Sequence, residues 1–440
     1  MLLILGEVFV DFTLPTSQKK CKLRLGGIVH ACRGLWAANI PYSVAIICPS
    51  YLQKETSSYL KAHGCSEVIF LGEIIGAPNV IAIADPTEVS EQGYEDLLRE
   101  TKEVLLNDVF NDLCKFNSIL IFPGSFDLNE IIKQFSTSAV FSIDIAYGVD
   151  SFSSLNPFKG RLLSIITSTS SDLFIEHGRN DITSLLKEIS SLGPNSFLLK
   201  ENRGGSRLFD FTNNEVLNIS STLDRTVNSV GVGDVYSAIV VALASDGRCW
   251  KEASRVGALA ATHYSQTTFP DDFKRDLHRS LLLPIEIQEK LGGTFLPWHE
   301  RNKYSIYFAA PDFSYVDRTI LDRVLACLSY HNFTVKRPII ENGELNAQSN
   351  EFERIQTFHQ DIELINQCDV VFAVPLGRDP GTLAEVGIAF AQKKPVITYD
   401  PKCENDNNMI TVGSTCYSDD MDLCLNSLFI TLSNIEKERK

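Results

Sequence analysis

The stretch that most constrains this 440-residue chain lies near its end, where residues 377–396 read GRDPGTLAEVGIAFAQKKPV. The run before it, residues 370–374, has the length and the Val and Phe content of a buried strand. Residues 383–391 are rich in Ala, Ile and Phe and predict a helix whose opening turn holds Glu385. Open α/β sheets bind their ligands where strands end and helices begin. We therefore expect Asp379 and Glu385 to face a pocket.

Each acid of this region also has a structural interpretation. In a first helical turn, Glu385 would gain about 0.3–1 kcal/mol from the helix dipole. Asp379 would begin the turn Asp379-Pro380-Gly381, and Asp361 would cap the helix that follows it. Tyr307, in the apolar run YSIYFAAPDF, would be a core aromatic residue. The residues alone leave both interpretations open.

Three pieces of the last third of the chain occur in the order YFAAPDF, DIELINQCDVV and DPGTLAEVGIAFAQKKPV. Together they resemble the nucleoside 2-deoxyribosyltransferase family, which includes deoxynucleoside 5′-monophosphate N-glycosidases. The resemblance implies that Glu385 attacks the anomeric carbon C1′, while Asp361 and Asp379 hold sugar hydroxyls or protonate the leaving base. It also implies that Tyr307 orients the nucleophile. Retaining glycoside hydrolysis uses the same pair of carboxyl groups.

The end of the chain departs from this family. Its transferases commonly complete the site with C-terminal residues of a neighbouring subunit, and the tail TLSNIEKERK offers no match. We therefore expect hydrolysis rather than base exchange. The family habit still implies a homo-oligomer such as a dimer. The charged residues 434–440 are expected to fray, and the polar insert 339–353 is expected to form a lid or an oligomer contact.

The N-terminal region alternates apolar runs with helical patterns. Residues 2–10 predict one strand, and further buried strands are expected at residues 118–122, 139–145, 162–166 and 197–200. Such alternation is typical of a mostly parallel sheet covered on both faces. The strand-like residues 78–85 are expected to join residues 12–25 in a small flap over the pocket.

The segment NSVGVGDVYSA carries the second chemical signal. Gly231, Val232 and Gly233 precede an apolar helix, so their amides would form an anion site at its positive end. Asp234 follows them, and in phosphoryl transfer it would accept the proton of an attacking hydroxyl. The structural alternative is that Asp234 is the N-cap residue of the helix.

Three segments, GEVFVDF, LGGIVHACRGLWAAN and NSVGVGDVYSA, resemble the PfkB, or ribokinase-like, sugar and nucleoside kinases over roughly the first 280 residues. The resemblance implies that Asp11 holds the sugar hydroxyls and that Gly26 and Gly27 line the substrate side. Residues 231–233 match the family's anion hole and Asp234 its catalytic base. Mg²⁺ and ATP are implied as cofactor and phosphoryl donor. On residues alone, the paired glycines would equally form a tight turn.

Several positions depart from the kinase pattern. The family's Asn after the paired glycines is Ala31, and its Asp before the anion hole is Asn228. The acidic metal-water motif reads TSTSSD and keeps only Asp172, and the nucleotide loop KENRGGS keeps only Gly205. An active kinase and a ligand-binding pseudo-kinase therefore both stay open. His30, beside the paired glycines, is a candidate to touch a substrate base.

We thus predict an α/β protein: a ribokinase-like αβα sandwich with a small β flap in residues 1–280, then a linker in residues 281–303. A smaller flavodoxin/Rossmann-like α/β domain follows in residues 304–440. The predicted function is bifunctional nucleoside processing, with ATP-dependent phosphorylation before N-glycosidic cleavage, because LGGIVHACRGL looks more like the nucleoside-directed, pseudouridine-kinase-like members. Two alternatives stay open: cleavage that supplies a sugar to the kinase, and a pseudo-kinase sensor that controls a nucleotide-degrading, NAD-directed glycosidase.

Composition limits the partners. A net charge of −15 argues against nucleic acid polymers, whose phosphates demand basic surfaces, but leaves small molecules, namely a nucleoside or an anionic nucleotide, as ligands. The 11 cysteines show no CxxC pair and no metal spacing, so we expect reduced thiols in a cytoplasmic protein and no protein-bound metal site. The opening MLLILGEVFVDF meets an acid at Glu7, which indicates a strand rather than a signal peptide. No run approaches the ~18 apolar residues of a membrane span.

Overall fold

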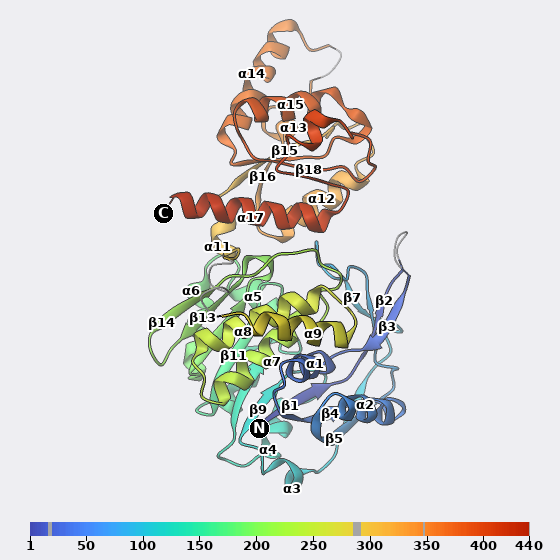
Figure 1. The fold of residues 1–440 in the computed structure, drawn as a ribbon, viewed down its shortest axis with the longest axis vertical. Coiled ribbons are helices and arrows are strands. Elements are labelled where there is room, and N and C mark those ends of the chain that lie inside the picture. The colour runs from blue at the N-terminus through green and yellow to red at the C-terminus, as the bar shows by residue number, and fades with distance from the viewer. Residues whose placement is uncertain (16–19, 285–291, 346–347, 440) are drawn as a thin grey trace. The chain divides into compact units, whose positions relative to one another are not determined.

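The computed structural model of the chain describes residues 1–15, 20–284, 292–345 and 348–439 (Figure 1). They form two compact units. The first comprises Met1–Glu88, Gln92–Thr222 and Thr226–Phe295, and the second comprises Val89–Glu91, Leu223–Arg225 and Leu296–Lys440. Part of the predicted linker, residues 285–291, and part of the polar insert, residues 346–347, lie outside the described residues.

The first unit is built on a ten-stranded sheet of order β14-β13-β12-β11-β10-β9-β1-β4-β5-β8. Its central pairs from β12 to β5 are parallel, and antiparallel strands close both edges. The predicted strands at residues 118–122, 139–145, 162–166 and 197–200 are confirmed as β9 to β12. The strands are β1 (Leu2–Glu7), β4 (Tyr42–Ile47), β5 (Cys65–Ile75), β8 (Glu103–Leu106), β9 (Ser118–Ile121), β10 (Val140–Asp144), β11 (Leu162–Ser168), β12 (Ser196–Lys200), β13 (Ser206–Asp210) and β14 (Glu215–Ile219).

Helices bury both faces of this sheet, since every residue of β1 and β4 is buried. Helices α1, α7, α8 and α9 pack against one another, and α4, η1 and α6 form a second group. The helices of this unit are α1 (Val29–Ala37), α2 (Ser50–Ala62), α3 (Phe110–Leu113), α4 (Leu128–Lys133), η1 (Phe152–Phe158), α5 (Asp172–His177), α6 (Ile182–Leu192), η2 (Asn202–Gly204), α7 (Val232–Ser245), α8 (Trp250–Ser265) and α9 (Pro270–Leu281).

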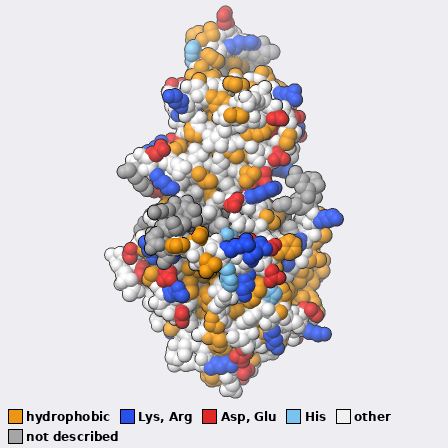
Figure 2. All heavy atoms as spheres, viewed as in Figure 1, with side chains coloured by type: hydrophobic (Ala, Val, Ile, Leu, Met, Phe, Trp, Pro, Cys, Tyr) orange, Lys and Arg blue, Asp and Glu red, His pale blue; other side chains and the backbone are white. Residues whose placement is uncertain are grey.

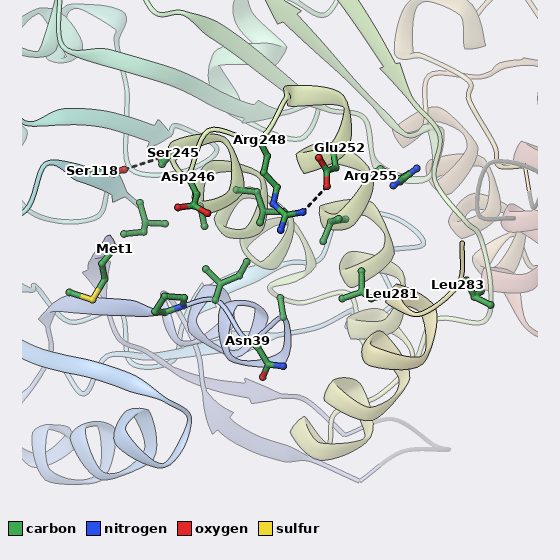
Figure 3. A pocket seen from close by; sticks show the side chains of 17 residues that line it. Met1, Asn39, Ser118, Ser245, Asp246, Arg248, Glu252, Arg255, Leu281 and Leu283 are labelled. Carbon is green, nitrogen blue, oxygen red and sulfur yellow. Dashed lines mark hydrogen bonds and ion pairs between the residues drawn. The ribbon is translucent and has the colours of Figure 1, made fainter. Parts of the chain in front are cut away.

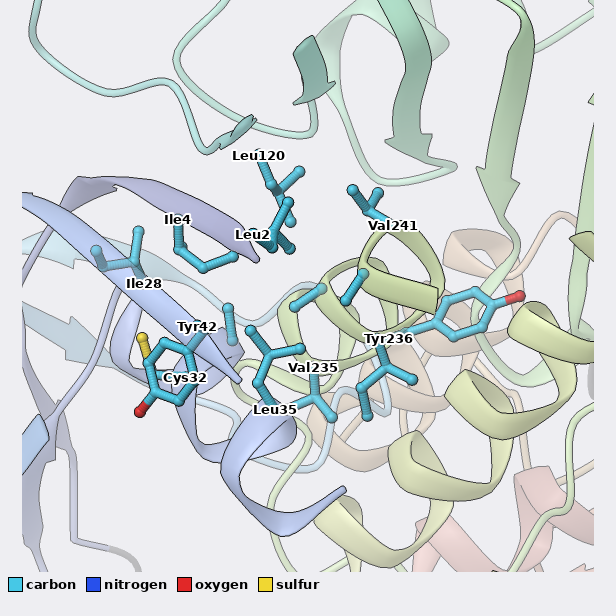
Figure 4. Close-up of a cluster of buried hydrophobic side chains, with 14 of the residues drawn as sticks. Leu2, Ile4, Ile28, Cys32, Leu35, Tyr42, Leu120, Val235, Tyr236 and Val241 are labelled. Atoms are coloured by element: carbon cyan, nitrogen blue, oxygen red, sulfur yellow. The ribbon is translucent and has the colours of Figure 1, made fainter. Parts of the chain in front are cut away.

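Helix α7 is the core helix of the first unit. Its residues from Val235 to Leu243 are all buried, which fits a helix that is apolar on every side. Figure 4 shows Val235, Tyr236 and Val241 among side chains of β1, β4 and α1. A Cβ atom on Gly34 of α1 would lie 2.9 Å from the Val235 side chain, so the two helices approach closely only because that residue is glycine.

The small sheet that was predicted as a flap is confirmed, with order β3-β2-β6-β7. Its strands are β2 (Val10–Thr13), β3 (Lys22–Leu25), β6 (Val80–Ile83) and β7 (Tyr94–Asp96). The single strand predicted for residues 2–10 is wrong, because the chain passes from the large to the small sheet after Glu7. The Val8 amide bonds to Ile47 beside β1, whereas the Val10 amide bonds to Asn79 beside β6.

The second unit has a five-stranded, all-parallel sheet of order β16-β15-β17-β18-β19, with helices on both faces. The predicted smaller α/β domain is thus confirmed in architecture. Its elements are α11 (Trp298–Arg301), β15 (Ser305–Ala309), α12 (Thr319–Tyr330), β16 (Thr334–Lys336), α13 (Pro338–Glu341), α14 (Glu351–Gln367), β17 (Val370–Ala373), η3 (Leu376–Arg378), α15 (Pro380–Ala391), β18 (Val396–Tyr399), α16 (Asn408–Thr411), β19 (Cys416–Ser418) and α17 (Met421–Arg439).

Side chains of β15 alternate between two cores, as the period of a strand requires. Ile306 and Phe308 join a core with α12 and α17, whereas Tyr307 and Ala309 join a core with α14 and α15. Figure 1 shows α17 on the opposite side of this sheet from α14 and α15. The face that carries Tyr307 is therefore the face that α14 and α15 cover.

The predicted fraying of residues 434–440 is wrong as far as Arg439, because α17 continues to that residue. Leu428, Phe429 and Leu432 are fully buried and hold the helix on the sheet. Near its end, the Arg439 guanidinium lies 2.7 Å from the Asp369 carboxylate. Tertiary packing thus overrides the charged composition of the tail.

The distribution of charged residues affects both the surface and the helices. Acidic and basic side chains are interspersed on the face that Figure 2 shows. Within the described ranges, every helix is too short or too polar to cross a bilayer.

Candidate functional site

The centre of the site in the second unit is a hydrogen bond between Tyr307 and Glu385. The Tyr307 hydroxyl donates to Glu385 Oε1 at 2.7 Å. Tyr307 reaches it from β15, and Glu385 comes from α15, which begins at Pro380 rather than at the predicted residue 383. Glu385 therefore lies in the second turn of α15 and not in its opening turn. Since helix-dipole stabilisation fades beyond the first turn, the dipole does not explain this glutamate.

Asp379 is the N-cap residue of α15. Its Oδ2 accepts hydrogen bonds from the Thr382 amide at 2.7 Å and from the Thr382 hydroxyl at 2.8 Å. Pro380 takes the first helical position, where its missing N–H costs nothing. The helix start that aims Glu385 at Tyr307 is thus fixed by Asp379, and the Asp379 charge also raises the pKa of Glu385.

Asp361 approaches the same pair from the interior of α14. The sequence interpretation of Asp361 as a helix cap is wrong, because α14 begins at Glu351 with Asn350 as its cap. The Asn342 side-chain amide donates to Asp361 Oδ1 at 2.7 Å. Burial raises the pKa of Asp361, which the Asn342 bond partly offsets. Sequence reasoning missed Asn342, since only the folded chain brings it to α14.

Burial dominates the ionisation of this site. It raises the pKa of Glu385 to about 8, the Tyr307 hydrogen bond opposes the shift, and the charges of Asp361 and Asp379 add to it. Burial and the two carboxylates Glu385 and Asp361 also raise the pKa of Tyr307, which keeps its phenol a proton donor. A buried carboxyl group of this kind ionises readily only when positive charge develops beside it. The site therefore suits a reaction that creates positive charge next to Glu385.

In the first unit, Gly231 is the N-cap of α7 and has φ +78, a left-handed conformation that suits glycine. A Cβ atom here would overlap the ring of His30. The amides of Gly231, Val232 and Gly233 stand at the positive end of a 14-residue helix. The alternative that Asp234 caps the helix is wrong, because Gly231 holds the cap position and Asp234 lies in the first turn.

Asp11 and His30 are in direct contact. His30 Nε2 lies 2.9 Å from Asp11 Oδ2, and its Nδ1 lies 2.7 Å from the Tyr264 hydroxyl. Burial lowers the pKa of His30 to about 4, so the ring is neutral at pH 7. Burial would raise the pKa of Asp11, but His30, Arg24 and Arg33 together hold it below its usual value. One oxygen of Asp11 is thus engaged by His30 and Arg24.

The paired glycines make room for this contact. A Cβ atom on Gly26 would overlap the carboxylate of Asp11, and one on Gly27 would overlap the backbone oxygen of Glu7. The Gly26 amide bonds to Phe9 O at 2.8 Å. The turn between β3 and α1 and the approach to Asp11 therefore need the same two glycines.

The carboxyl group of Asp234 has a strongly shifted pKa. Burial raises it to about 7, the Lys200 ammonium opposes the shift, and the charges of Asp144 and Asp11 add to it. The side chain is nevertheless only half-buried at the start of α7. A group with a pKa near 7 at an open helix start is suited to take up a proton at neutral pH.

Sequence reasoning missed three residues beside Asp234. The Lys200 ammonium lies 2.6 Å from Asp144 Oδ2 and 3.1 Å from Ser237 Oγ, and Ser237 Oγ donates to Asp144 Oδ2 at 2.7 Å. A Cβ atom on Gly233 would lie 3.3 Å from Lys200 Nζ, so the lysine reaches the start of α7. The available signal was charge: Lys200 and Asp144 end two strands of one sheet that carry no other charged residue.

Other candidate positions have local roles. Gly205 follows η2 in a turn with φ +91, and Asp172 is the first residue of α5. Asn228 accepts a hydrogen bond from Arg24 at 2.9 Å, which ties β3 to the loop before α7. Val232 packs against the core of the first unit.

The residues at the start of α7 and Lys200 fit a phosphoryl group but do not form a set of metal ligands. The amides at the start of α7 and the nearby Lys200 ammonium are both suited to phosphate oxygens. Over the described part of the chain, no group of three or more His, Cys, Asp or Glu side chains is arranged to hold a metal ion. We therefore assign no protein ligands to Mg²⁺.

A separate cavity of about 510 Å³ lies at the far end of α7 (Figure 3). Met1, Ser118 and Asp246 line it, at the amino ends of β1 and β9 and just after the end of α7. A helix of 14 residues is about 20 Å long, so this cavity is distinct from the surroundings of Asp234.

Residues 306–427 match the family model described as nucleoside 2-deoxyribosyltransferase. The second unit carries a domain of that family. The matched residues include Tyr307, Asp361, Asp379 and Glu385, so the deoxyribosyltransferase-like domain contains the whole site built above. No curated protein matches the chain.

Several solved structures are similar to the first unit. Ribokinase from Giardia lamblia is 16% identical with a TM-score of 0.49, covering 64% of this chain and 98% of that chain. A nucleoside kinase from Methanocaldococcus jannaschii, an archaeal member of the ribokinase family, is 14% identical with a TM-score of 0.45, covering 63% and 98%. A putative ribokinase II from E. coli in complex with ATP and Mg²⁺ is 11% identical with a TM-score of 0.45, covering 63% and 99%. The family model for residues 306–427 names the same family that the C-terminal motifs resemble.

Proposed function

We propose that this protein is a bifunctional nucleoside-processing enzyme. The first unit phosphorylates a nucleoside with ATP, and the deoxyribosyltransferase-like domain cleaves the N-glycosidic bond of the resulting 5′-monophosphate. The observation that carries the proposal is the 2.7 Å hydrogen bond from Tyr307 to Glu385, next to the charge of Asp361. It supports a nucleophilic carboxylate with a second carboxyl group at hand.

Cleavage takes two steps. Glu385, whose pKa is raised to about 8, first gives its proton to solvent, and the carboxylate then attacks C1′ through Oε2, because Oε1 accepts the Tyr307 hydrogen bond. The C1′–N bond breaks, its electron pair leaves with the base nitrogen, and Asp361, whose pKa is raised by burial, donates a proton to that nitrogen. Water then attacks C1′ of the glycosyl ester, gives a proton to the Asp361 carboxylate and releases the sugar phosphate with the Glu385 carboxylate.

Phosphorylation uses the start of α7. Asp234, with a pKa raised to about 7, takes the proton of the attacking hydroxyl. The amides of residues 231–233 and the Lys200 ammonium bind the oxygens of the moving group as its charge shifts. ATP supplies the phosphoryl group. Phosphorylation first gives the second site a substrate that carries a phosphate.

The test is chromatography of nucleosides incubated with the full chain, with and without ATP and Mg²⁺. We expect free base only when ATP is present. Asp234→Asn should abolish ATP-dependent phosphorylation and still cleave supplied nucleoside monophosphate, and Glu385→Gln should do the reverse. Loss of both activities from either single change, or the absence of base release from every nucleoside and monophosphate, would overturn the proposal.

A second candidate is a pseudo-kinase sensor that controls the glycosidase. The engagement of Asp11 by His30 and Arg24 favours it, because an occupied carboxylate is less free to hold sugar hydroxyls. The same incubation separates the two functions. ATP that stays intact while base release depends on an added nucleoside would support the sensor, and base release without ATP, followed by sugar phosphorylation, would support the reverse order of reactions.

A further inference from the structure

Two tyrosines from different sheets meet near Asp234. Tyr94 belongs to β7 of the small sheet, and Tyr147 lies three residues after the end of β10 in the large sheet. Their ring centroids are 6.0 Å apart and the ring planes are at 90°. Burial is the main cause that raises the pKa of both phenols, and the charges of Glu88 and Asp234 add to it. The pair is not part of either motif that the sequence showed.

Both rings are partly open to solvent. Tyr94 is 38% exposed and Tyr147 is 57% exposed. Even so, burial is the main reason why the pKa of each phenol is raised. Asp234, at the start of α7, is also partly exposed.

The ring of Tyr94 is held relative to the start of α7. Its hydroxyl donates to Gln92 Oε1 at 2.7 Å, and Gln92 Nε2 donates to Ser229 Oγ at 2.8 Å. Ser229 lies two residues before Gly231, the cap of α7. The hydrogen bonds therefore couple the small sheet to the loop that carries the anion site.

The loop of Tyr147 is anchored as well. The Ala146 amide donates to Asp144 Oδ1 at 3.2 Å, and Asp144 is bound to Lys200. A Cβ atom on Gly148 would come within 2.7 Å of the Pro123 backbone, so this loop packs tightly on its neighbour. A ring presented by an anchored loop loses little conformational freedom when a ligand stacks on it.

We propose that Tyr94 and Tyr147 bind the planar base of the nucleoside whose hydroxyl Asp234 deprotonates. This inference rests on the proposed kinase function and narrows its substrate class to nucleosides rather than free sugars, since a free sugar has no planar ring. Bases stack on aromatic side chains with little dependence on sequence.

The test is calorimetric titration of the full chain with adenosine, cytidine and D-ribose in the absence of ATP. We expect at least tenfold tighter binding of both nucleosides than of ribose. Tyr147→Leu should weaken nucleoside binding at least tenfold and leave ribose binding unchanged, whereas Tyr147→Phe, which keeps the ring, should stay within about twofold of the parent. Tyr51→Leu on α2 is the matched control, because Tyr51 is also 57% exposed and lies on an unrelated helix.

Equal affinity of the parent for nucleosides and ribose, no binding of either nucleoside, or unchanged nucleoside binding by Tyr147→Leu would each overturn the inference. Failure of the kinase function is distinguishable. If nucleosides bind in a Tyr147-dependent way but ATP is never consumed, the phosphorylation proposal falls and the base-binding pair stands. If ribose is phosphorylated as readily as nucleosides and Tyr147→Leu changes no KM, only the base-binding pair falls.

Discussion

The half-buried carboxyl group of Glu385 makes the stability of the second unit depend on pH. In the unfolded chain this group ionises near the ordinary glutamate pKa of 4.5, whereas in the folded domain its pKa is about 8. Between these values the folded state holds a proton that the unfolded state has lost. The contribution of Glu385 is therefore fully favourable below pH 4.5 and is lost as the pH rises through about 8. Glu385→Gln, which does not ionise, removes this loss.

The size of the effect follows from the shift. At about 1.36 kcal/mol per unit, the gap between 4.5 and about 8 corresponds to at most about 5 kcal/mol. Glu385 is only half-buried, so solvent screening reduces this limit, and we expect about 2–3 kcal/mol at pH 8.5. The glutamine keeps a carbonyl oxygen that accepts from Tyr307. The variant should therefore match the parent near pH 5 and exceed its stability at pH 8.5.

Urea unfolding with one tryptophan as reporter measures this difference. Of the three tryptophans, Trp36 and Trp250 lie in the first unit and Trp298 lies in the second. A Trp36→Phe, Trp250→Phe background leaves Trp298 to report on the domain that contains Glu385. The control is Glu363→Gln on α14, the same change at an exposed side chain, and it should give no pH-dependent gain. An equal effect of Glu385→Gln at pH 5 and 8.5 would refute the reasoning.

The remaining predictions concern activity and the stability of the first unit. Tyr307→Phe removes the bond that lowers the pKa of Glu385, so the pH profile of base release should move upward and the rate at pH 7 should fall about tenfold, as chromatography of released base would show. Lys200→Met removes the cation that lowers the pKa of Asp234. The pH at which the rate of ADP formation rises, measured in a coupled assay, should therefore move above about 7. Lys200→Arg, which keeps the charge, should move this pH less. Gly231→Ala forces a methyl group into the His30 ring, and thermal melting should show destabilisation of the first unit by more than about 1 kcal/mol, whereas Gly247→Ala, with open space around its Cβ, should cost less.

The sequence predicted what depends on local pattern. Apolar runs located β9 to β12 and the small sheet, and the motif around Gly231 located a helix start with an acid in its first turn. The sequence did not predict that the run through Glu7 divides between two sheets, because apolar residues continue on both sides of Glu7. Nor did it reveal the Lys200–Asp144 pair, which joins residues 56 positions apart.

Two predictions were wrong because tertiary packing decides these positions and local composition does not show it. The charged tail was expected to fray, but the apolar residues of α17 one turn earlier bury it on the sheet. Asp361 was expected near an element end, but the helix that holds it begins ten residues upstream at Glu351. The Tyr94–Tyr147 contact depends on how the small sheet packs against the large sheet. The spacing of residues in the sequence does not indicate this packing.

Helix α7 is both the core helix of the first unit and the helix whose start carries the candidate site. Its body from Val235 to Leu243 is buried, and its start carries the cap residue Gly231 followed by Gly233 and Asp234. The residues that we propose to bind phosphate are therefore expected to unfold together with the hydrophobic interior. On heating, phosphorylation activity should be lost at the temperature at which the first unit unfolds. No folded but inactive form should accumulate at lower temperatures.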